Sequence, residues 1–468
     1  MNKTGMVMNQ EIFGTDGIRG KALEGWLSVE AVEALGRAAG AVLGTEAAAE
    51  ALIAHDGRAS AMALQEALAR GLAASGVTAH TAGLLPTPGL AWLTATKSVS
   101  LGVMISASHN PAEDNGIKLF AGGGSKLTDA QQAEIETRLR QEIERKPQAS
   151  AAPNAATVST GTLQEDAHLE DLYAEHLIAL AKSGEPLDLA GAKVVIDCAN
   201  GAASRVGPRV LEAIGADVTA LFHAPDGTNI NAGCGSTYPE PLQERVRASG
   251  ADFGVALDGD ADRCLLVDEK GDLVDGDGIM AILARDAAAR GLWSDSRIVA
   301  TVMSNRGLHR ALDPVGVGVV EVGVGDRQVV EGLREHGLRL GGEKSGHIIF
   351  GADSGFIGDG LLTALHVLGV RARNGQTLSE LAAPFVPFPQ VLLGLKVRSK
   401  PALETLPEFH EKCRRFEEEL GADGRINVRY SGTEPKARVM IEGPDAARIQ
   451  EIADDLVEAL RTEIDKAG

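Results

Sequence analysis

Short apolar runs rich in Val and Ile recur along the chain, at residues 101–105, 194–196, 253–257 and 317–320. Runs of this length, separated by segments with helical periodicity, are typical of strands buried on both faces of a sheet. The alternation predicts an α/β fold. In three places an apolar strand runs directly into a polar or glycine-rich loop, at 106–111, 258–263 and 342–347. Because α/β proteins bind ligands at the carboxyl ends of parallel strands, we expect the chemistry in these loops.

Two segments show the clearest helical pattern. Residues 128–146 begin with Thr128 as a candidate cap and repeat apolar side chains every four residues at Ile135, Leu139 and Ile143. After Pro444 and Asp445, the last segment places five apolar residues on one face: Ile449, Ile452, Leu456, Leu460 and Ile464. We predict a helix in each segment.

The chain has 468 residues, which is too long for one hydrophobic core. Its composition breaks at 146–162, rich in Ala, Ser, Thr and Pro, and at 384–389, where three prolines interrupt any helix. A weaker break lies near 268–278. These breaks predict four domains, at 1–158, 159–270, 271–384 and 385–468.

Composition limits the possible partners. With 44% apolar residues the chain can bury a core, and its net charge of −20 argues against a broad binding surface for nucleic acid or anionic membrane. No apolar stretch is long enough to span a membrane, and the N-terminus lacks a signal-peptide pattern, so we expect a cytoplasmic enzyme. The four cysteines lie far apart and are expected to be reduced. Any anion must therefore be bound by a local cluster.

The loop at 258–263 reads Asp-Gly-Asp-Ala-Asp-Arg. Carboxylates at alternate positions can turn several oxygens toward one small cation, and Mg²⁺ prefers such ligands. A solvated acidic turn is the alternative, but three like charges at the end of a buried strand repel one another unless a cation neutralises them. An EF-hand calcium loop fits less well because its central glycine is missing.

The loop at 106–111 places a serine beside His109, and Lys118 follows seven residues after the loop ends. A serine at a strand end can act as a nucleophile when a base or a metal activates it. Without a GxSxG elbow, phosphoryl chemistry is favoured over acyl transfer. A simple Ser/Asn/Pro turn is the alternative, and Lys118 is a candidate acid/base or a local positive charge.

Two further loops carry polar groups. In the loop at 342–347, Glu343 and Ser345 can bind sugar hydroxyls and His347 can contact a phosphate, although a surface turn has the same composition. Residues 429–438 place two arginines around a Ser-Gly-Thr turn, which suits a phosphate site. Arg19 in the N-terminal FGTDGIRG segment offers a similar contact.

Seven ordered motifs span residues 13–438: FGTDGIRG, SASHNP with DNGIK, NAGCGSTYPE, DGDADR, VGDR, GEKSGH and RYSGTEP. On these motifs the chain resembles the α-D-phosphohexomutase superfamily. The resemblance implies four domains around a central cleft, each contributing one loop. Three would be α/β domains with mixed sheets, and the smaller C-terminal one an α+β domain.

The resemblance also implies roles for the candidate residues. Ser108 would carry a transferable phosphoryl group, and Mg²⁺ would be bound by Ser108, Asp258, Asp260 and Asp262. The groups near the transferring phosphate would be His109, Lys118, Arg19 and Arg263. The sugar would be read by Glu343, Ser345 and His347, and its distal phosphate held by Arg429, Ser431, Gly432, Thr433 and Arg438. Lys344 departs from the Gln or Met common in the family, which leaves the preference at the sugar C2 position open.

As an activity, the resemblance implies interconversion of glucosamine 6-phosphate and glucosamine 1-phosphate through a 1,6-bisphosphate, which also serves as primer. The product would lead to UDP-N-acetylglucosamine and the cell wall. Phosphomannomutase/phosphoglucomutase activity is the near alternative. A Mg²⁺ phosphomonoesterase and a sugar-phosphate-binding scaffold are the distant ones. The expected partners are small sugar phosphates, with neither nucleic acid nor membrane, and the expected state is a monomer or homodimer.

Overall fold

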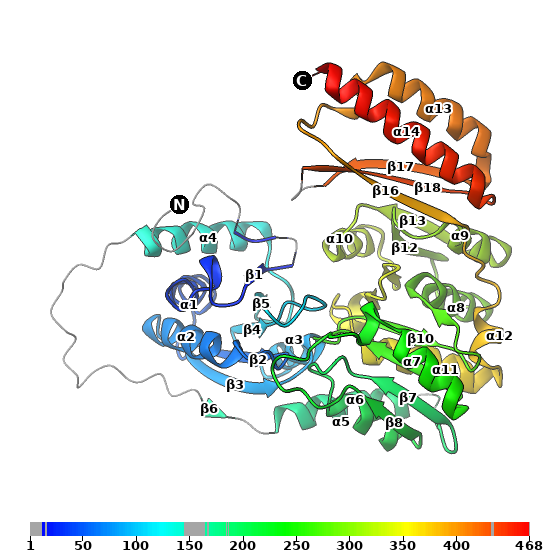
Figure 1. Cartoon of the computed structure of the whole chain (residues 1–468). Coiled ribbons are helices and arrows are strands. Elements are labelled where there is room, and N and C mark those ends of the chain that lie inside the picture. The colour runs from blue at the N-terminus through cyan, green and yellow to red at the C-terminus, as the bar shows by residue number, and fades with distance from the viewer. Residues whose placement is uncertain are drawn as a thin grey trace, which may run out of the picture.

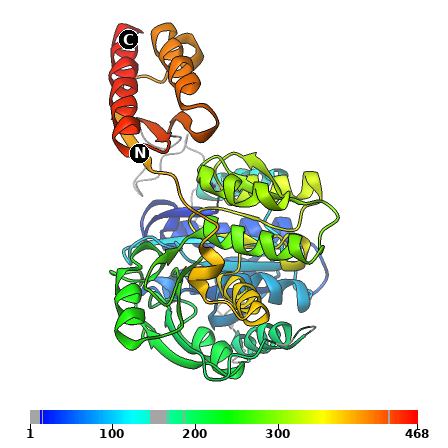
Figure 2. The same cartoon turned by 90° about the vertical axis from the view of Figure 1, so that its right-hand side faces the viewer.

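The computed structural model describes residues 12–14, 16–144, 164–165, 168–183, 185, 187–431 and 435–467 (Figure 1). The linker expected at 146–162 lies outside these residues. In the described parts, the strands form sheets of six, five, four and three strands. The three larger sheets are mixed and covered by helices, and the smallest is antiparallel with two helices, so the predicted α/β class is confirmed (Figures 1 and 2).

The N-terminal unit holds the six-stranded sheet, in the order β1-β5-β4-β2-β3-β6. Its elements are β1 (Ile18–Lys21), α1 (Val29–Leu43), β2 (Glu50–His55), α2 (Ala61–Ala74), β3 (Thr78–Leu84), α3 (Thr87–Thr96), β4 (Leu101–Ile105), β5 (Asp114–Ala121), α4 (Asp129–Glu144) and β6 (Gln164–Glu165). The predicted helix after Thr128 is confirmed as α4, with the Gln131 N–H donating to Thr128 Oγ1.

The second unit holds the five-stranded sheet, in the order β11-β10-β9-β7-β8. Its elements are α5 (Leu169–Lys182), β7 (Lys193–Asp197), α6 (Val206–Ala213), β8 (Asp217–Leu221), α7 (Glu240–Ser249), β9 (Phe253–Leu257), β10 (Cys264–Val267) and β11 (Leu273–Val274). The predicted strands at 101–105, 194–196 and 253–257 are confirmed as β4, β7 and β9, and their side chains are buried.

The third unit holds the four-stranded sheet, in the order β13-β12-β14-β15. Its elements are α8 (Gly276–Ala289), β12 (Arg297–Thr301), α9 (Arg306–Leu312), β13 (Gly318–Val322), α10 (Asp326–His336), β14 (Gly341–Gly342), β15 (Ile348–Ile349), α11 (Gly360–Asn374) and α12 (Leu378–Ala382). The run at 317–320 does form a strand, but the expectation that it is buried on both faces is wrong. β13 lies at one edge of this sheet, and most of its side chains are half-buried or exposed.

The C-terminal unit holds the three-stranded sheet, in the order β16-β18-β17. Its elements are β16 (Gln390–Lys396), α13 (Pro407–Leu420), β17 (Arg425–Tyr430), β18 (Lys436–Glu442) and α14 (Ala446–Ala467). The predicted C-terminal helix is confirmed as α14, and its five apolar residues are buried. Residues 384–389 contain no helix, as their prolines predicted.

The three larger sheets share one hydrophobic core. In β2, Leu52 and Ala54 join a cluster that continues through α5 and α11, whereas Ala51 and Ile53 face a separate cluster with α1 and α2. The second and third sheets likewise have one face in the shared cluster. The buried apolar residues of the C-terminal unit form their own cluster. Three units are therefore packed as one body, and the fourth is attached through 384–389. The domain boundaries at 158, 270 and 384 stay predictions.

The four cysteines are free and three of them are buried, as expected. Within the described ranges, none of the helices is both long enough and apolar enough to cross a membrane.

A buried carboxylate lies where the third unit meets the C-terminal one. Asp277 accepts a hydrogen bond from the Asn305 N–H at 2.8 Å, and the Asn305 side chain bonds both the N–H and the carbonyl of Phe388. Burial, followed by the nearby Asp275, raises the pKa of Asp277 to about 7. Between about pH 4 and pH 7, the folded protein therefore holds a proton on Asp277 that the unfolded chain has already lost.

This proton makes the stability of the protein depend on pH. Relative to Asp277→Asn, the wild-type free energy of unfolding should fall as the pH rises from about 4 to about 7, by about 2 to 4 kcal/mol. Urea unfolding at a series of pH values measures the difference. The exposed control Asp313→Asn should follow the wild type, and parallel profiles for wild type and Asp277→Asn would contradict the assignment.

Candidate active site

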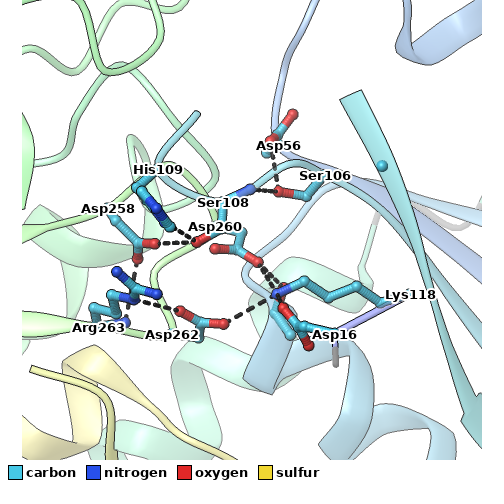
Figure 3. Close-up of polar contacts among 12 residues, drawn as sticks. Asp16, Asp56, Ser106, Ser108, His109, Lys118, Asp258, Asp260, Asp262 and Arg263 are labelled. Carbon is cyan, nitrogen blue, oxygen red and sulfur yellow. Dashed lines mark hydrogen bonds and ion pairs between the residues drawn. The ribbon is translucent and has the colours of Figure 1, made fainter. Parts of the chain in front are cut away.

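The three polar loops occupy the same topological position. Each connects a strand that pairs in parallel with a neighbour to a following antiparallel strand: β4 to β5, β9 to β10 and β14 to β15. The first two loops lie against each other (Figure 3), and the third reaches them through His347. The Ser108 hydroxyl donates to Asp258 Oδ2 at 2.6 Å, and His347 Nε2 lies 4.0 Å from Asp262 Oδ2.

The Ser108 loop has a strained and closely supported backbone. Ser108 is buried and has a φ of 53°, in the left-handed region that non-glycine residues rarely adopt. Its N–H donates to Ser106 Oγ at 2.8 Å, and Ser106 Oγ donates to Asp56 Oδ2 at 2.6 Å (Figure 3). A backbone held this way fixes the direction of the serine hydroxyl.

Two side chains from distant parts of the sequence hold the carbonyl groups of this loop. Arg58 donates to the carbonyls of Ser108 at 3.1 Å and Asn110 at 2.8 Å, and it pairs with Asp56 at 2.9 Å with both side chains fully buried. Asn231 of the second unit also donates to the Ser108 carbonyl, at 2.8 Å. The loop is therefore anchored to two units at once.

A glycine permits this close packing. A Cβ atom at Gly259 would lie only 2.6 Å from the Ser108 carbonyl oxygen, so a larger residue there would push the serine loop away from the aspartate loop. Glycine is therefore required at position 259 because a side chain there would collide with the serine loop.

The three aspartates of this motif form a compact acidic cluster. Asp258, Asp260 and Asp262 are buried, and one ligand atom from each lies within 4.8 Å of the others. Burial, followed by the charges of the other two, holds the pKa of Asp258 well above its usual value. Among the described residues, Asp260 Oδ1 and Asp262 Oδ1 have no hydrogen-bond partner. Unpartnered, closely spaced, buried carboxylate oxygens fit a divalent cation, so the cluster is a candidate metal centre.

Lys118 is the nearest cation to this cluster. Its ammonium lies 2.8 Å from Asp260, 3.1 Å from Asp262 and 2.8 Å from Asp16 (Figure 3). Burial lowers the pKa of Lys118, but these three carboxylates outweigh it and raise the pKa well above its usual value. The side chain therefore stays protonated at neutral pH, which favours a role as fixed charge over one as a base.

The other predicted groups lie around Ser108. His109 Nδ1 is 3.3 Å from Ser108 Oγ, and burial followed by the charges of Arg263 and Arg19 lowers the His109 pKa to about 4. The imidazole is thus neutral at neutral pH and can form a hydrogen bond with the Ser108 hydroxyl. Arg263 donates its backbone N–H to Asp258 and places its side chain 4.0 Å from Asp262. Arg19 pairs with Asp16 at 2.7 Å.

The loop at 342–347 reaches the acidic cluster through His347. Glu343 accepts the N–H of Gly325 at 3.1 Å, at the start of α10. Within the described structure, Ser345 Oγ and His347 Nδ1 are buried without a hydrogen-bond partner, as expected of groups awaiting a polar ligand. Lys344 contacts the C-terminal unit instead of the acidic cluster: its amine is 3.5 Å from Gln390 Oε1, at the start of β16. The departure at Lys344 thus lies at the junction with the C-terminal unit.

The arginine loop lies in the C-terminal unit. Arg429 and Arg438 face each other across β17 and β18, and burial followed by the charge of Arg438 lowers the pKa of Arg429. Lys400 donates to the Ser431 carbonyl at 2.5 Å. Gly432 and Thr433 lie outside the described residues. The C-terminal unit stands on the third unit, apart from the N-terminal one, so β17 and β18 lie away from the unit that carries Ser108 (Figures 1 and 2).

Several site residues were missed by the sequence analysis. They are Asp16, Asp56, Arg58, Thr87, Lys126, Asn231 and Asp326. A signal existed for some of them: Asp56 and Arg58 directly follow β2, and Asp16, Asn231 and Asp326 lie inside motifs that were recognised. Thr87, whose hydroxyl donates to Asp260 at 2.6 Å, begins a helix and carries no comparable signal.

Four family models match this chain in sequence order. They are described as phosphoglucomutase/phosphomannomutase α/β/α domain I, matching residues 10–146; domain II, 171–271; domain III, 275–388; and the C-terminal domain, 392–459.

Relatives match over nearly the whole length. The chain is 46% identical to the phosphoglucosamine mutase of Symbiobacterium thermophilum, covering 97% of this chain and 99% of the relative. It is 45% identical to that of Myxococcus xanthus, covering 97% of each. Among solved structures, a phosphoglucomutase/phosphomannomutase family protein from Burkholderia thailandensis is 26% identical with a TM-score of 0.78, covering 98% of each chain. The N-acetylphosphoglucosamine mutase of Aspergillus fumigatus, solved with GlcNAc-6P and magnesium, shares the fold at 19% identity, with a TM-score of 0.67, covering 98% of this chain and 97% of that one.

The Asp56–Arg58 pair provides a test of how the serine loop is held. Arg58→Met leaves Asp56 as a buried unpaired charge and should cost about 3 to 5 kcal/mol of stability. Adding Asp56→Asn should recover much of that loss. The amides of residues 106–110 should still exchange faster than in the wild type, because the loop carbonyls have lost the Arg58 donor.

Chemical denaturation and hydrogen exchange measure the two effects. The control Arg70→Met removes an exposed ion pair with Glu33 and should cost less than about 1 kcal/mol. A loss from Arg58→Met as small as that of the control would show that the buried pair does not support the loop.

Proposed function

The chain belongs to the phosphoglucomutase/phosphomannomutase family, and from that premise we propose that it is a phosphoglucosamine mutase. This isomerase interconverts glucosamine 6-phosphate and glucosamine 1-phosphate through a phosphoserine and a 1,6-bisphosphate. The substrate assignment is supported by relatives of that name at about 45% identity over nearly their full lengths.

One observation carries the reaction type: the Ser108 hydroxyl lies 2.6 Å from Asp258, inside a buried cluster of three carboxylates. A serine placed against carboxylates alone is a poor site for an anion. A serine that carries a phosphoryl group beside a bound divalent cation is a stable arrangement, because the cation offsets both sets of negative charge. A scaffold that only binds sugar phosphates needs neither group.

We assign the metal to Mg²⁺, held by Asp258, Asp260, Asp262 and one oxygen on Ser108. The fit rests on the unpartnered carboxylate oxygens of the cluster. When bound, Mg²⁺ supplies positive charge that stabilises the transferring phosphoryl group. The chain's own cations add to this effect: Lys118 and Arg263 lie against the same carboxylates, and Arg19 is tied to Lys118 through Asp16.

The proposed reaction consists of two balanced transfers. In the first, the bond from Ser108 Oγ to phosphorus breaks as a bond forms from phosphorus to the free hydroxyl of the sugar phosphate; that hydroxyl loses its proton and Ser108 Oγ gains one. In the second, the other phosphate of the bisphosphate returns to Ser108 Oγ, which loses its proton, and the sugar oxygen that it leaves gains one. His109, neutral and 3.3 Å from Ser108 Oγ, is placed to hydrogen-bond this oxygen during both transfers.

Substrate binding is divided between two loops. Glu343, Ser345 and His347 read the sugar, and the position of His347 beside Asp262 supports contact at the reacting end. Arg429, Ser431, Gly432, Thr433 and Arg438 hold the distal phosphate. The C-terminal unit has its own core and is linked through 384–389, so it can close over a sugar bound in either direction. This freedom suits an intermediate that must turn around between the two transfers.

The remaining assignments follow from the reaction. A sugar 1,6-bisphosphate primes Ser108, and the product leads to UDP-N-acetylglucosamine for the cell wall. The enzyme is cytoplasmic, acts on small sugar phosphates as a monomer or homodimer, and has neither a nucleic acid nor a membrane partner. Phosphomannomutase/phosphoglucomutase activity is the second candidate, because the same site can accept a hydroxyl at C2.

The test is conversion of glucosamine 6-phosphate by protein primed with a hexose 1,6-bisphosphate in the presence of Mg²⁺. We expect glucosamine 1-phosphate as the main product, with kcat/KM higher than for the glucose and mannose phosphates. Ser108→Ala should be inactive, because no phosphoryl acceptor remains. Higher kcat/KM on glucose or mannose phosphate would favour the second candidate, and free phosphate as the main product would indicate a phosphatase.

The distal clamp has a separate test. If Arg438 pairs with a desolvated phosphate, Arg438→Ala should cost about 2 to 5 kcal/mol of transition-state stabilisation, measured as a loss in kcat/KM. The control Arg461→Ala, on the exposed side of α14, should be near wild type. Unchanged kinetics for Arg438→Ala would remove this residue from the clamp.

A further inference from the structure

A line of alternating charges leads from the acidic cluster to the third unit. Lys118 lies between the cluster and Asp16, and Lys126 lies 2.6 Å from the other oxygen of Asp16. Lys126 also pairs closely with Asp326, the first residue of α10. The order is thus Asp326, Lys126, Asp16, Lys118 and then the cluster. It passes from the third unit through the N-terminal unit to the second.

These side chains are well shielded from water. The exposed fraction of the side chain is 4% for Lys118, 18% for Asp16, 28% for Lys126 and 13% for Asp326. Their interactions are therefore screened much less than those of surface ion pairs. Burial acts against ionisation, but the carboxylates of Asp16 and Asp326 raise the pKa of Lys126, and the cations around Asp16 hold its pKa well below the usual value. The line is fully charged at neutral pH.

Each member of the line is shared between neighbours. Asp16 forms ion pairs with Lys118, Lys126 and Arg19. Lys118 forms ion pairs with both Asp16 and the acidic cluster. If Lys126 lost Asp326, it would pair more strongly with Asp16. Asp16 would then hold Lys118 less, and Lys118 would move its charge toward Asp260 and Asp262. If Lys126 were removed, Asp16 would draw Lys118 away from them.

We propose that Asp326, Lys126 and Asp16 are positioning residues that set how strongly Lys118 competes with a divalent cation for the three aspartates. The third unit, which carries the sugar-reading loop, thereby tunes the metal centre in the second unit. This inference rests on the metal assignment in the proposed function. It predicts opposite effects for the two partners of one ion pair.

The chain offers a matched control. Arg327 pairs closely with Asp129 and joins the same two units, but Asp129 is 78% exposed. Loss of this pair removes an interdomain contact and a negative charge without disturbing the line through Asp16. A general effect of interdomain contacts would appear in the control as well.

The experiment is titration of the metal-free, dephosphorylated protein with Mn²⁺, with free Mn²⁺ followed by electron paramagnetic resonance. Asp326→Asn should weaken Mn²⁺ binding by about three- to tenfold, and Lys126→Met should strengthen it by a similar factor. Lys126→Arg and Asp129→Asn should bind as the wild type does. The same substitutions in a Lys118→Met background should have little effect, because their action passes through Lys118. Thermal unfolding confirms that each variant is folded.

Three results would overturn the inference: equal affinities for all variants, a shift of the same sign for Asp326→Asn and Lys126→Met, or full effects that persist in the Lys118→Met background. The last would mean that the charges act through space rather than by positioning Lys118. A wild type that fails to bind Mn²⁺ would instead contradict the metal assignment in the proposed function, and the inference with it.

Discussion

Three buried carboxylates with ligand atoms within 4.8 Å of one another are the constraint on which the rest of the site depends. Their mutual repulsion must be offset, because buried like charges destabilise a fold. Lys118, Arg263 and the Ser108 hydroxyl supply the compensation that the chain itself can give. Two carboxylate oxygens still lack a partner among the described residues, which is why a divalent cation fits. An acidic protein of net charge −20 can thus bind an anionic sugar phosphate, because positive charge is gathered where the phosphates would lie.

The hydrophobic clusters divide the protein into a rigid body of three units and a separately packed C-terminal unit. The three mixed sheets share one hydrophobic cluster, so the ends of β4, β9 and β14 are fixed relative to one another. Phosphoryl transfer depends mainly on such positioning. The C-terminal unit has a separate core and meets the third unit through polar contacts such as that of Arg425 with the Ser304 carbonyl. In the proposed mechanism the rigid part carries the reacting groups, and the attached part would hold the phosphate that does not react.

The strand ends could be predicted from the sequence, because an apolar run followed by a polar loop is a pattern of neighbouring residues. Ser108, His109 and the three aspartates were found in this way, Lys118 was found from its place after the serine loop, and all of them lie together. Arg58 and Asn231 were not found, because their roles come from contacts with Ser108 across 50 and 123 residues of sequence. The edge position of β13 and the junction contact of Lys344 depend on strand order and unit packing, which no local pattern encodes.

The central claim is that Ser108, held beside the acidic cluster, donates its phosphoryl group to the sugar. A single turnover of protein labelled with ³²P on Ser108, mixed with unlabelled glucosamine 6-phosphate and Mg²⁺, tests this directly. The account predicts that the label leaves Ser108 and appears first in the glucosamine 1,6-bisphosphate. Label released as inorganic phosphate, or label that stays on the protein while product forms, would contradict it.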